Sequence, residues 1–392
     1  MTKRPLHAVL LSGVADAARL LDPLAAALGG TGPAILPLDA GLPTARLRRM
    51  LDAFRPDAVV EPGGETTSRS GGQGADEDTA VIIGTSGSTG EPKGVELSAA
   101  ALLHSARASL ARAGARPGER WLVCLPVTHV AGLQVLVRSL ASDTEPAVVP
   151  HPDAASLLAA GCAHVSVVPT QLVRLLDGGA DALAAFSSVL VGGAAASAAV
   201  LRRARTAGVP VMTTYGMTET CGGCVYDGVP LDGVSVRADS EGRLRISGPV
   251  LMNRYYRRPD RTAAVLRDGE FVTSDLGAVQ GGRVVVRGRA DDVINTGGYK
   301  VVPGEVAAAL ETCPGVREVV VVGRPDPEWG ERVTAVVVPA DPDDPPSLEL
   351  LRTHVRERLP RYASPSEVVL TDAIPVLPSG KPDLAALKTT ET

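Results

Sequence analysis

Residues 85–94 contain the side chains and glycines that a phosphate-binding loop needs. The segment has four hydroxyl residues, three glycines and one lysine, and it follows the apolar run Val81–Ile83. It reads Thr85-Ser86-Gly87-Ser88-Thr89-Gly90-Glu91-Pro92-Lys93-Gly94. Glycines let backbone N–H groups point inward around an anion, hydroxyls add donors, and a lysine adds positive charge. These residues predict a loop that binds a polyphosphate.

The segment is not a Walker A loop, which needs a second glycine five residues after the first, followed by Lys and then Ser or Thr. Thr89 and Pro92 stand five residues after Gly84 and Gly87. An ordinary flexible Gly/Ser loop is the alternative interpretation on composition alone.

Two later segments carry groups suited to nucleotide chemistry. Tyr215-Gly216-Met217-Thr218-Glu219-Thr220 combines a ring, hydroxyls and a carboxylate. These groups could stack on a base, contact a phosphate and hold Mg²⁺, although a polar turn after a strand is the alternative. Asp275, within Thr273–Gly277, is predicted to lie in a tight turn, where an Asp is often only a turn former.

Four further residues have both a functional and an ordinary interpretation. Arg289 and Asp291 lie at an expected domain boundary, where they suit a ligand clamp and a hinge, or a surface salt-bridge cluster. Lys381 lies in a turn near the C-terminus, where an exposed, solvated lysine is common. His129 is predicted at the end of an apolar strand, where a histidine is more often structural than catalytic.

An α/β framework is predicted to position these motifs. Between about residues 119 and 215, apolar strand-like runs alternate with Ala- and Leu-rich helical segments. Ala99–Ala113 is predicted as a helix, with Ser98 as its N-cap and Gly114 at its end. This alternation predicts a largely buried sheet. The predicted strands are Trp121–Leu125, Ala147–Val149, Val165–Val168, Val189–Val191 and Val209–Met212.

The remaining chain predicts a smaller β region and a separate C-terminal module. Short Val-, Arg- and Gly-containing runs between residues 233 and 286 suggest antiparallel strands, whereas residues 61–78 are predicted to be a linker or exposed loop. We predict a large α/β domain over residues 1–289, with a reduced N-terminal subdomain and a small β subdomain. A small, mobile α+β domain is predicted over residues 290–392.

Composition narrows the function classes. The chain has 392 residues, of which 45% are hydrophobic and 21% charged, and its formal net charge is −5. This balance argues against general nucleic-acid or membrane-surface binding, so local basic groups must bind any anionic ligand. The apolar stretch at residues 8–11 is too short to span a membrane, and the protein is predicted to be cytoplasmic.

Five cysteines are scattered along the chain, and two of them form Cys221-Gly222-Gly223-Cys224. The CxxC spacing fits a redox pair or half of a zinc site. No second Cys/His pair with ligand spacing accompanies it in the sequence, so no metal or redox role is predicted for these thiols.

In their order along the chain, these motifs resemble the adenylate-forming superfamily of acyl-CoA ligases, adenylation domains and luciferases. The resemblance covers roughly residues 80–385. It implies two steps in one enzyme: a carboxylate and ATP give an acyl-adenylate and pyrophosphate, and CoA then displaces AMP. ATP, Mg²⁺ and CoA are therefore the expected cofactor and co-substrates.

The resemblance also implies roles for individual residues. Thr85 to Lys93 would wrap the β- and γ-phosphates, Thr218 would contact the α-phosphate, and Glu219 would hold Mg²⁺. Lys381 would bridge the attacking carboxylate and the α-phosphate, and Asp291 would be the hinge. The expected nucleotide contacts also include Gly192, Gly193 and Ala194 beside the adenine, Tyr215 and Gly216 at its face, and Asp275 and Arg289 at the ribose. Residues 296–300, with Gly298 and Lys300, would help build the CoA channel.

Within the superfamily, the chain looks like the compact bacterial form of the o-succinylbenzoate–CoA ligases of menaquinone biosynthesis. The segments that carry this likeness are 126–138, 168–172 and 215–233. On this interpretation His129 is a gate beside the acyl site, and small residues make room for an aromatic acid. The candidate pocket residues are Arg138, Thr170, Gln171, Met217, Gly222 and Gly223.

Two other functions are left open by the sequence. A related aryl- or acyl-CoA ligase, or a stand-alone adenylation enzyme that loads a carrier protein, would use the same nucleotide motifs. A non-catalytic relative is disfavoured by the intact Lys93, Glu219, Asp275, Arg289 and Lys381. Because the N-terminal region is shortened, the sequence does not predict which residues form the outer wall of the pocket or the surface of a homodimer.

Overall fold

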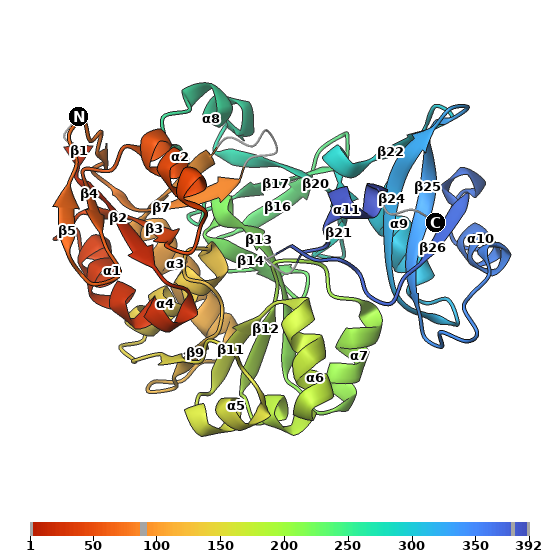
Figure 1. Cartoon of the computed structure of the whole chain (residues 1–392), viewed down its shortest axis with the longest axis horizontal. Helices are drawn as coiled ribbons and strands as arrows, with labels where there is room; N and C mark the ends of the chain where they lie inside the picture. Colours follow the sequence, from red (N-terminus) through yellow and green to blue (C-terminus); the bar gives the residue numbers. More distant parts are fainter. Residues whose placement is uncertain (1–2, 87–91, 378–380, 390–392) are drawn as a thin grey trace. The chain divides into compact units, whose positions relative to one another are not determined.

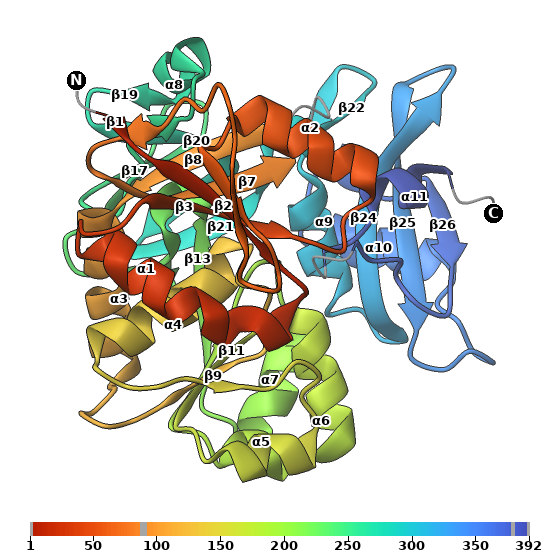
Figure 2. The same ribbon diagram turned by 60° about the vertical axis from the view of Figure 1, so that its left-hand side comes forward.

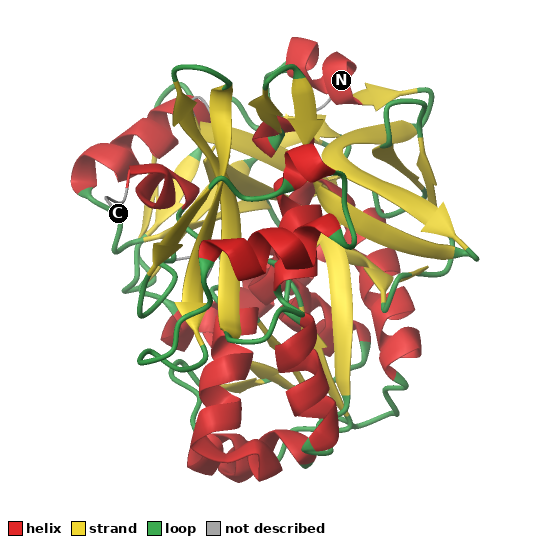
Figure 3. Cartoon of the chain, turned by 90° about the vertical axis from the view of Figure 1, so that its right-hand side faces the viewer, coloured by secondary structure: helices red, strands yellow, loops and turns green. Residues whose placement is uncertain are grey.

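The computed structural model describes residues 3–86, 92–377 and 381–389, which fall into two compact units (Figure 1). The first unit comprises Met1–Gly193, Ala204–Ser235 and Ile246–Val272. The second comprises Ala194–Arg203, Val236–Arg245 and Thr273–Thr392. Helices and strands occur in both units, as the α/β prediction requires (Figure 3). The domain boundary at residue 290 and the mobility of the second domain stay predictions.

A seven-stranded sheet near the N-terminus carries the predicted phosphate loop. Its order is β18-β8-β7-β3-β2-β4-β5, with β2 parallel to β3 and β4, and β7 antiparallel to β8. Helices α1 (Leu21–Leu28) and α2 (Thr44–Phe54) flank it (Figure 2). The strands are β2 (Leu6–Leu11), β3 (Ala34–Asp39), β4 (Ala58–Val60), β5 (Thr66–Ser68), β7 (Thr79–Ser86), β8 (Pro92–Ser98) and β18 (Arg254–Tyr255).

The second seven-stranded sheet carries the Tyr215–Thr220 motif. Its order is β10-β9-β11-β12-β13-β14-β15; the first five strands are parallel, and β14 turns back antiparallel to β13. The strands are β9 (Trp121–Val123), β10 (Ala147–Val148), β11 (His164–Val167), β12 (Ser188–Val191), β13 (Val211–Met217), β14 (Gly222–Tyr226) and β15 (Val229–Pro230). All five predicted strands between residues 121 and 212 are present, with ends shifted by a few residues.

Helices cover the strands of this first unit because their apolar residues recur at helical spacing. Helix α3 (Ala99–Ala113) confirms its prediction, since Ser98 Oγ accepts from the Ala101 N–H and Gly114 adopts φ 66°. The other helices here are α4 (Val130–Ala141), α5 (Ala154–Ala160), α6 (Pro169–Ala184) and α8 (Pro259–Val265), with 3₁₀ turns η1 (Val14–Leu20) and η2 (Thr218–Thr220). Helix α7 (Ala198–Thr206) has residues in both units.

The second unit has its own core of valine-rich strands. Strands β24 (Val316–Asp326) and β25 (Gly330–Pro339) form a long antiparallel pair, and β26 (Glu367–Leu370) joins β25 in parallel. A buried cluster that includes Val306, Val337 and Leu351 packs helices against this sheet. The other elements are β22 (Ile294–Thr296), β23 (Tyr299–Val301), α9 (Pro303–Leu310), α10 (Leu348–Arg356), α11 (Leu384–Thr389), η3 (Ala290–Asp292) and η4 (Arg361–Ala363).

A further sheet has the order β16-β17-β20-β19, with β21 paired to β20. Its strands are β16 (Ser235–Ala238), β17 (Arg243–Ser247), β19 (Leu266–Arg267), β20 (Glu270–Gln280) and β21 (Arg283–Arg289). The predicted tight turn at Thr273–Gly277 is wrong, because these residues lie inside β20. Their alternating burial explains this, since Phe271, Thr273 and Asp275 face inward from one side of an extended chain.

The predicted loop at residues 61–78 also needs correction. It contains β5, which pairs with β4, and β6 (Ala75–Asp76), which pairs with β1 (Lys3–Arg4). Consecutive threonines favour extended backbone, so a polar segment at a sheet edge can still form a strand. No helix among the described residues has the length and apolar character needed to cross a membrane.

A buried carboxyl group on β8 makes stability depend on pH. Glu96 is 2% exposed and accepts a hydrogen bond of 2.9 Å from Thr79 Oγ1. Burial raises the Glu96 pKa from 4.5 to about 7; nearby Asp76 and Asp78 add to this, whereas the hydrogen bond from Thr79 and the charge of Arg254 oppose it. The folded state therefore keeps a proton that the unfolded state releases, and the free energy of unfolding falls as pH rises from 4.5 through 7.

We expect the Glu96→Gln variant to lack this decrease in the free energy of unfolding as pH rises. Its stability advantage over the wild type should grow by on the order of 3 kcal/mol between about pH 4.5 and pH 8. Thermal and urea unfolding at several pH values measure the difference. Glu65→Gln, at an exposed position, is the control. A pH-independent difference between wild type and Glu96→Gln would show that Glu96 does not carry the effect.

Candidate active site

The predicted phosphate loop connects the antiparallel strands β7 and β8. Thr85 pairs with Lys93 and Ser86 pairs with Pro92, and Thr85 Oγ1 donates to the Lys93 carbonyl at 3.1 Å. The centre of the loop, with the predicted phosphate contacts Gly87, Ser88, Thr89 and Gly90, lies outside the described residues. The ends of the segment therefore form a hairpin whose second strand begins with Pro92 and Lys93.

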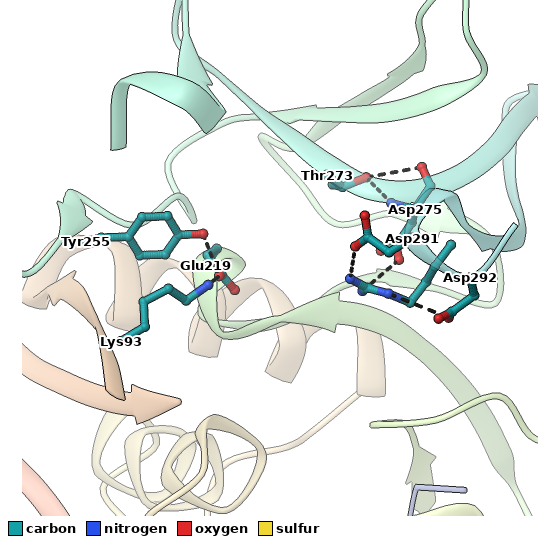
Figure 4. Close-up of polar contacts among 8 residues, drawn as sticks. Lys93, Glu219, Tyr255, Thr273, Asp275, Asp291 and Asp292 are labelled. Atoms are coloured by element: carbon teal, nitrogen blue, oxygen red, sulfur yellow. Dashed lines mark hydrogen bonds and ion pairs between the residues drawn. The ribbon is translucent and has the colours of Figure 1, made fainter. Parts of the chain in front are cut away.

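Lys93 and Glu219 form an ion pair in the first unit. Lys93 Nζ lies 2.9 Å from Glu219 Oε1, and the two side chains are only 21% and 12% exposed. Tyr255, which the sequence analysis did not select, donates its hydroxyl proton to the same Oε1 at 2.8 Å. Its ring centroid lies 4.2 Å from Lys93 Nζ, a cation–π distance. Figure 4 shows Lys93, Glu219 and Tyr255 pointing toward one another.

Tyr255 could have been noticed because tandem tyrosines are unusual in this chain. Aromatic residues make up 3% of the sequence, yet Tyr255 and Tyr256 are adjacent. No local pattern connects them to Glu219, which lies 36 residues earlier than Tyr255. Pairing of β18 with β8, which places Tyr255 opposite Val95, brings the phenol to the carboxylate.

The Glu219 carboxylate fits the role of a magnesium ligand shared with a nucleotide. Both of its side-chain contacts in the described chain are to Oε1, which leaves Oε2 available to a cation. The described residues contain no group of three or more His, Cys, Asp or Glu side chains that could hold a metal. Mg²⁺ is usually bound by one or two carboxylates together with substrate phosphates. A single carboxylate beside a predicted phosphate loop suits that arrangement.

The turn that presents Glu219 is held by its own backbone and side chains. Thr220 Oγ1 accepts from the Met217 N–H at 3.0 Å and donates to the Gly222 carbonyl at 2.8 Å. A Cβ on Gly216 would collide with the Gly222 carbonyl oxygen, so only glycine fits there. The predicted residues Tyr215, Gly216 and Met217 lie at the end of β13, and Thr218 opens η2.

Small residues also follow β12, where the sequence predicts an adenine slot. A Cβ on Gly192 would collide with Thr214 Oγ1, and Gly193 adopts φ +82°. Gly192 directly follows Val191, which pairs with Thr213 on β13, so its missing side chain permits close approach to that strand. The adenine contacts of Gly192, Gly193, Ala194 and Tyr215 stay predictions.

The predicted acid-pocket residues lie at different depths in the first unit. Exposed His129 is the N-cap residue of α4, and a Cβ on Gly222 would lie 3.8 Å from Val130 Cγ2. The start of α4 and the Gly222-Gly223 turn therefore lie close together. Thr170 is exposed at the start of α6. The Gln171 side-chain amide accepts from the Val168 N–H and donates to the Cys124 carbonyl.

Arg138 occupies an interior position. It is 4% exposed, and its guanidinium donates to Ser109 Oγ at 3.2 Å and to Ser166 Oγ at 2.9 Å. The same group lies 4.1 Å from the centroid of the Trp121 ring. No ion pair between Arg138 and a carboxylate is found within the described ranges. These contacts hold α4 against the sheet, and binding of a substrate carboxylate by Arg138 stays a prediction.

In the second unit, Arg289 contacts three carboxylates. Arg289 Nη1 lies 3.3 Å from Asp275 Oδ1, and Nη2 lies 3.0 Å from Asp291 Oδ2; Asp292 is 4.0 Å from Nε. The β20–β21 register places Asp275 opposite Arg289, and the Asp275 N–H donates to Thr273 Oγ1 (Figure 4). The predicted ribose pair is therefore in contact, and the predicted hinge residue Asp291 shares its arginine.

The predicted CoA-channel and C-terminal residues also lie in the second unit. Lys300 is exposed on β23, and Gly298 adopts φ +81° in the preceding turn. Lys381 is exposed, and its carbonyl accepts from the Leu377 N–H at 2.8 Å. Exposure leaves the Lys300 and Lys381 ammonium groups accessible to a ligand.

The CxxC thiols are unsuited to redox chemistry or metal binding. Cys221 and Cys224 are both fully buried, and neither forms a disulfide. Burial raises the pKa of the Cys221 thiol and raises that of Cys224 to about 12. Since the thiolate is the reactive form, these residues behave as small apolar side chains behind the Glu219 turn.

Comparison with known proteins adds the family context. Models of the AMP-binding enzymes and of their C-terminal domain match residues 69–256 and 305–381. A probable 2-succinylbenzoate–CoA ligase of Mycobacterium tuberculosis is 41% identical over 384 residues, which cover 94% of both chains. The 2-succinylbenzoate–CoA ligase of Bacillus velezensis is 32% identical and covers 78% of this chain and 67% of its own.

Two solved structures have a fold similar to that of this chain. ATP-bound MatB from Rhodopseudomonas palustris has a TM-score of 0.85 at 25% identity, covering 99% of this chain and 89% of its own. The o-succinylbenzoate CoA synthetase MenE from Bacillus subtilis, in complex with AMP, has a TM-score of 0.80 at 25% identity, with coverages of 98% and 88%. The large N-terminal and small C-terminal domains predicted for this chain match these folds.

Proposed function

Because this chain belongs to the AMP-binding enzymes, we propose that it joins 2-succinylbenzoate to CoA in an ATP-dependent, AMP-forming reaction. The observation that carries the proposal is the 41% identity to a probable 2-succinylbenzoate–CoA ligase over 94% of both chains. A similarity of this extent includes the segments expected to select the acid as well as the nucleotide motifs. The product would serve menaquinone biosynthesis.

The reaction has two steps. A substrate carboxylate oxygen attacks the α-phosphorus of ATP, the bond from that phosphorus to the bridging oxygen breaks, and pyrophosphate leaves. The CoA thiolate then attacks the acyl carbon of the adenylate, and AMP leaves with the electrons of the carbon–oxygen bond. Positioning and neutralisation of phosphate charge are the main contributions of a protein to such a displacement.

First-unit residues would act on the triphosphate. Lys93 and the loop from Thr85 would bind the β- and γ-phosphates, and Thr218 would contact the α-phosphate. Glu219 would hold Mg²⁺, which supplies positive charge to the phosphate oxygens when bound. The ion pair between Lys93 and Glu219 supports these roles, because both groups already lie side by side. Tyr215 would stack on adenine.

Second-unit residues would complete nucleotide recognition and both half-reactions. The Asp275 carboxylate and Arg289 would bind the ribose hydroxyls, and their 3.3 Å contact supports a shared role. Lys381 would neutralise charge between the attacking carboxylate and the α-phosphate. Residues 296–300 would contact CoA. Asp291 would act as the hinge for the C-terminal domain.

The acid would be recognised near the start of α4. His129 would gate the acyl site, and the Gly222-Gly223 turn would leave room for an aromatic ring. Gly222 lies close to Val130, in the first turn of α4. Thr170 is available as a donor, because it is exposed. Gln171 already uses its amide in two backbone contacts, so it would shape the pocket wall.

A pyrophosphate-release assay tests the substrate. With ATP, Mg²⁺ and CoA present, we expect 2-succinylbenzoate to give sustained pyrophosphate release and 2-succinylbenzoyl-CoA detectable by mass spectrometry. Benzoate, succinate and a medium-chain fatty acid serve as comparison acids. Without CoA, release should stop after the enzyme-bound adenylate has formed.

Two outcomes would contradict the proposal. If another acid gave release and 2-succinylbenzoate did not, the substrate would be wrong while the family assignment stood. If the adenylate formed but its acyl group passed only to a phosphopantetheinyl carrier protein, the chain would be a stand-alone adenylation enzyme.

A further inference from the structure

The segment Met252–Tyr256 connects the strand that carries Lys93 with the turn that carries Glu219. The Met252 N–H donates to the Glu219 carbonyl at 2.8 Å, and the Tyr256 N–H donates to the Gly94 carbonyl at 2.8 Å. Between them, β18 pairs with β8 and places Tyr255 opposite Val95. The backbone of this segment is therefore fixed on both sides, which determines where the Tyr255 side chain points.

The Tyr255 side chain contacts both members of the ion pair. Its hydroxyl is 2.8 Å from Glu219 Oε1, and Lys93 Nζ lies 4.2 Å from its ring centroid (Figure 4). The residue is only 5% exposed.

Two side chains donate to Glu219 Oε1, the Lys93 ammonium group and the Tyr255 hydroxyl. On the proposed function the Lys93 ammonium group would share its three N–H donors between Glu219 and the phosphates. The Tyr255 hydroxyl has no proposed contact with the nucleotide, so its hydrogen bond to Oε1 would stay with Glu219. We propose that Tyr255 is a positioning residue that fixes the orientation of Glu219 for Mg²⁺ in the nucleotide complex. The proposal rests on the proposed function for the roles of Glu219 and Lys93.

The Tyr255→Phe variant tests this role, because it keeps the ring under Lys93 and removes only the hydroxyl. The probe is α,β-methylene ATP, whose binding is measured by calorimetry with Mg²⁺ and, separately, with EDTA. We expect the Kd with Mg²⁺ to rise about tenfold, in the range seen when a hydrogen-bond partner of a metal ligand is removed. The Kd in EDTA should stay unchanged.

Tyr256→Phe is the matched control. Tyr256 is also 5% exposed and also donates its hydroxyl proton, but to the Gly74 carbonyl at 2.7 Å. Both variants remove one buried hydroxyl from adjacent positions, so a general loss of packing or stability would affect both. We expect Tyr256→Phe to bind the analogue as the wild type does under both conditions.

An equal rise in Kd with and without Mg²⁺, or equal effects of the two variants, would overturn the positioning role of Tyr255. So would a Tyr255→Phe variant with wild-type affinity under both conditions. The experiment needs no carboxylic acid, so it can succeed or fail independently of the 2-succinylbenzoate assay.

Discussion

Replacing Lys381 with alanine is expected to all but abolish acyl-adenylate formation while leaving much of the thioester formation from supplied acyl-adenylate. An exposed ammonium group that neutralises charge between the carboxylate and the α-phosphate acts only in the first step. Loss of one such electrostatic contact lowers the rate by about 10²–10³-fold. Pyrophosphate release measures the first half-reaction, and CoA thioester formation from synthetic acyl-adenylate measures the second.

Lys388→Ala provides the control for Lys381→Ala. Lys388 is also exposed, lies on α11 in the same unit, and has no proposed role in either half-reaction. We expect it to retain both activities. A Lys381→Ala variant in which the two half-reactions fell equally would contradict a specific role for Lys381 in adenylation.

Replacing Glu219 with glutamine is expected to lower pyrophosphate release by about 10²-fold or more, the effect of losing an electrostatic contact to the reacting phosphates. Glutamine keeps the size of the side chain and its contact with Tyr255, but it lacks the charge that binds Mg²⁺. Raising the Mg²⁺ concentration should restore part of the activity, since the remaining ligands come from the nucleotide. Initial rates over a Mg²⁺ series measure both effects.

Glu96→Gln is the control for Glu219→Gln, because it makes the same substitution at another carboxyl group with little exposure in the same unit. Glu96 contacts Thr79 and lies on β8 three residues after Lys93, on the opposite face of the strand. We expect its pyrophosphate release at neutral pH to match the wild type. If Glu219→Gln also matched the wild type over the whole Mg²⁺ series, Glu219 would not be the magnesium ligand.

Local features of the fold could be predicted because they depend on neighbouring residues. Helix α3 begins and ends where Ser98 and Gly114 predicted, since a side-chain cap and a left-handed glycine act within one turn. Asp275 was misplaced for the converse reason. Its sequence context resembles a turn, but pairing of β20 with β21 makes it part of a strand opposite Arg289.

The same distinction between local and long-range interactions applies to the candidate site. The predicted residues Lys93 and Glu219 have side chains suited to phosphate and magnesium, and that much follows from chemistry and local spacing. Tyr255 was not predicted, and Arg138 was expected in the acid pocket although its guanidinium contacts Ser109, Ser166 and Trp121. Burial and partners of a side chain depend on elements far away in the sequence.

The sequence by itself determined the chemical groups of this protein, their order and the family that they indicate. The tertiary structure alone decided that Lys93 and Glu219, which are 126 residues apart, meet at one carboxylate oxygen beside Tyr255. The physical reason is the distance along the sequence over which each kind of interaction acts. Caps and turns act over a few residues, whereas this contact needs β8, β18 and the turn after β13 to pack together before the three side chains can touch.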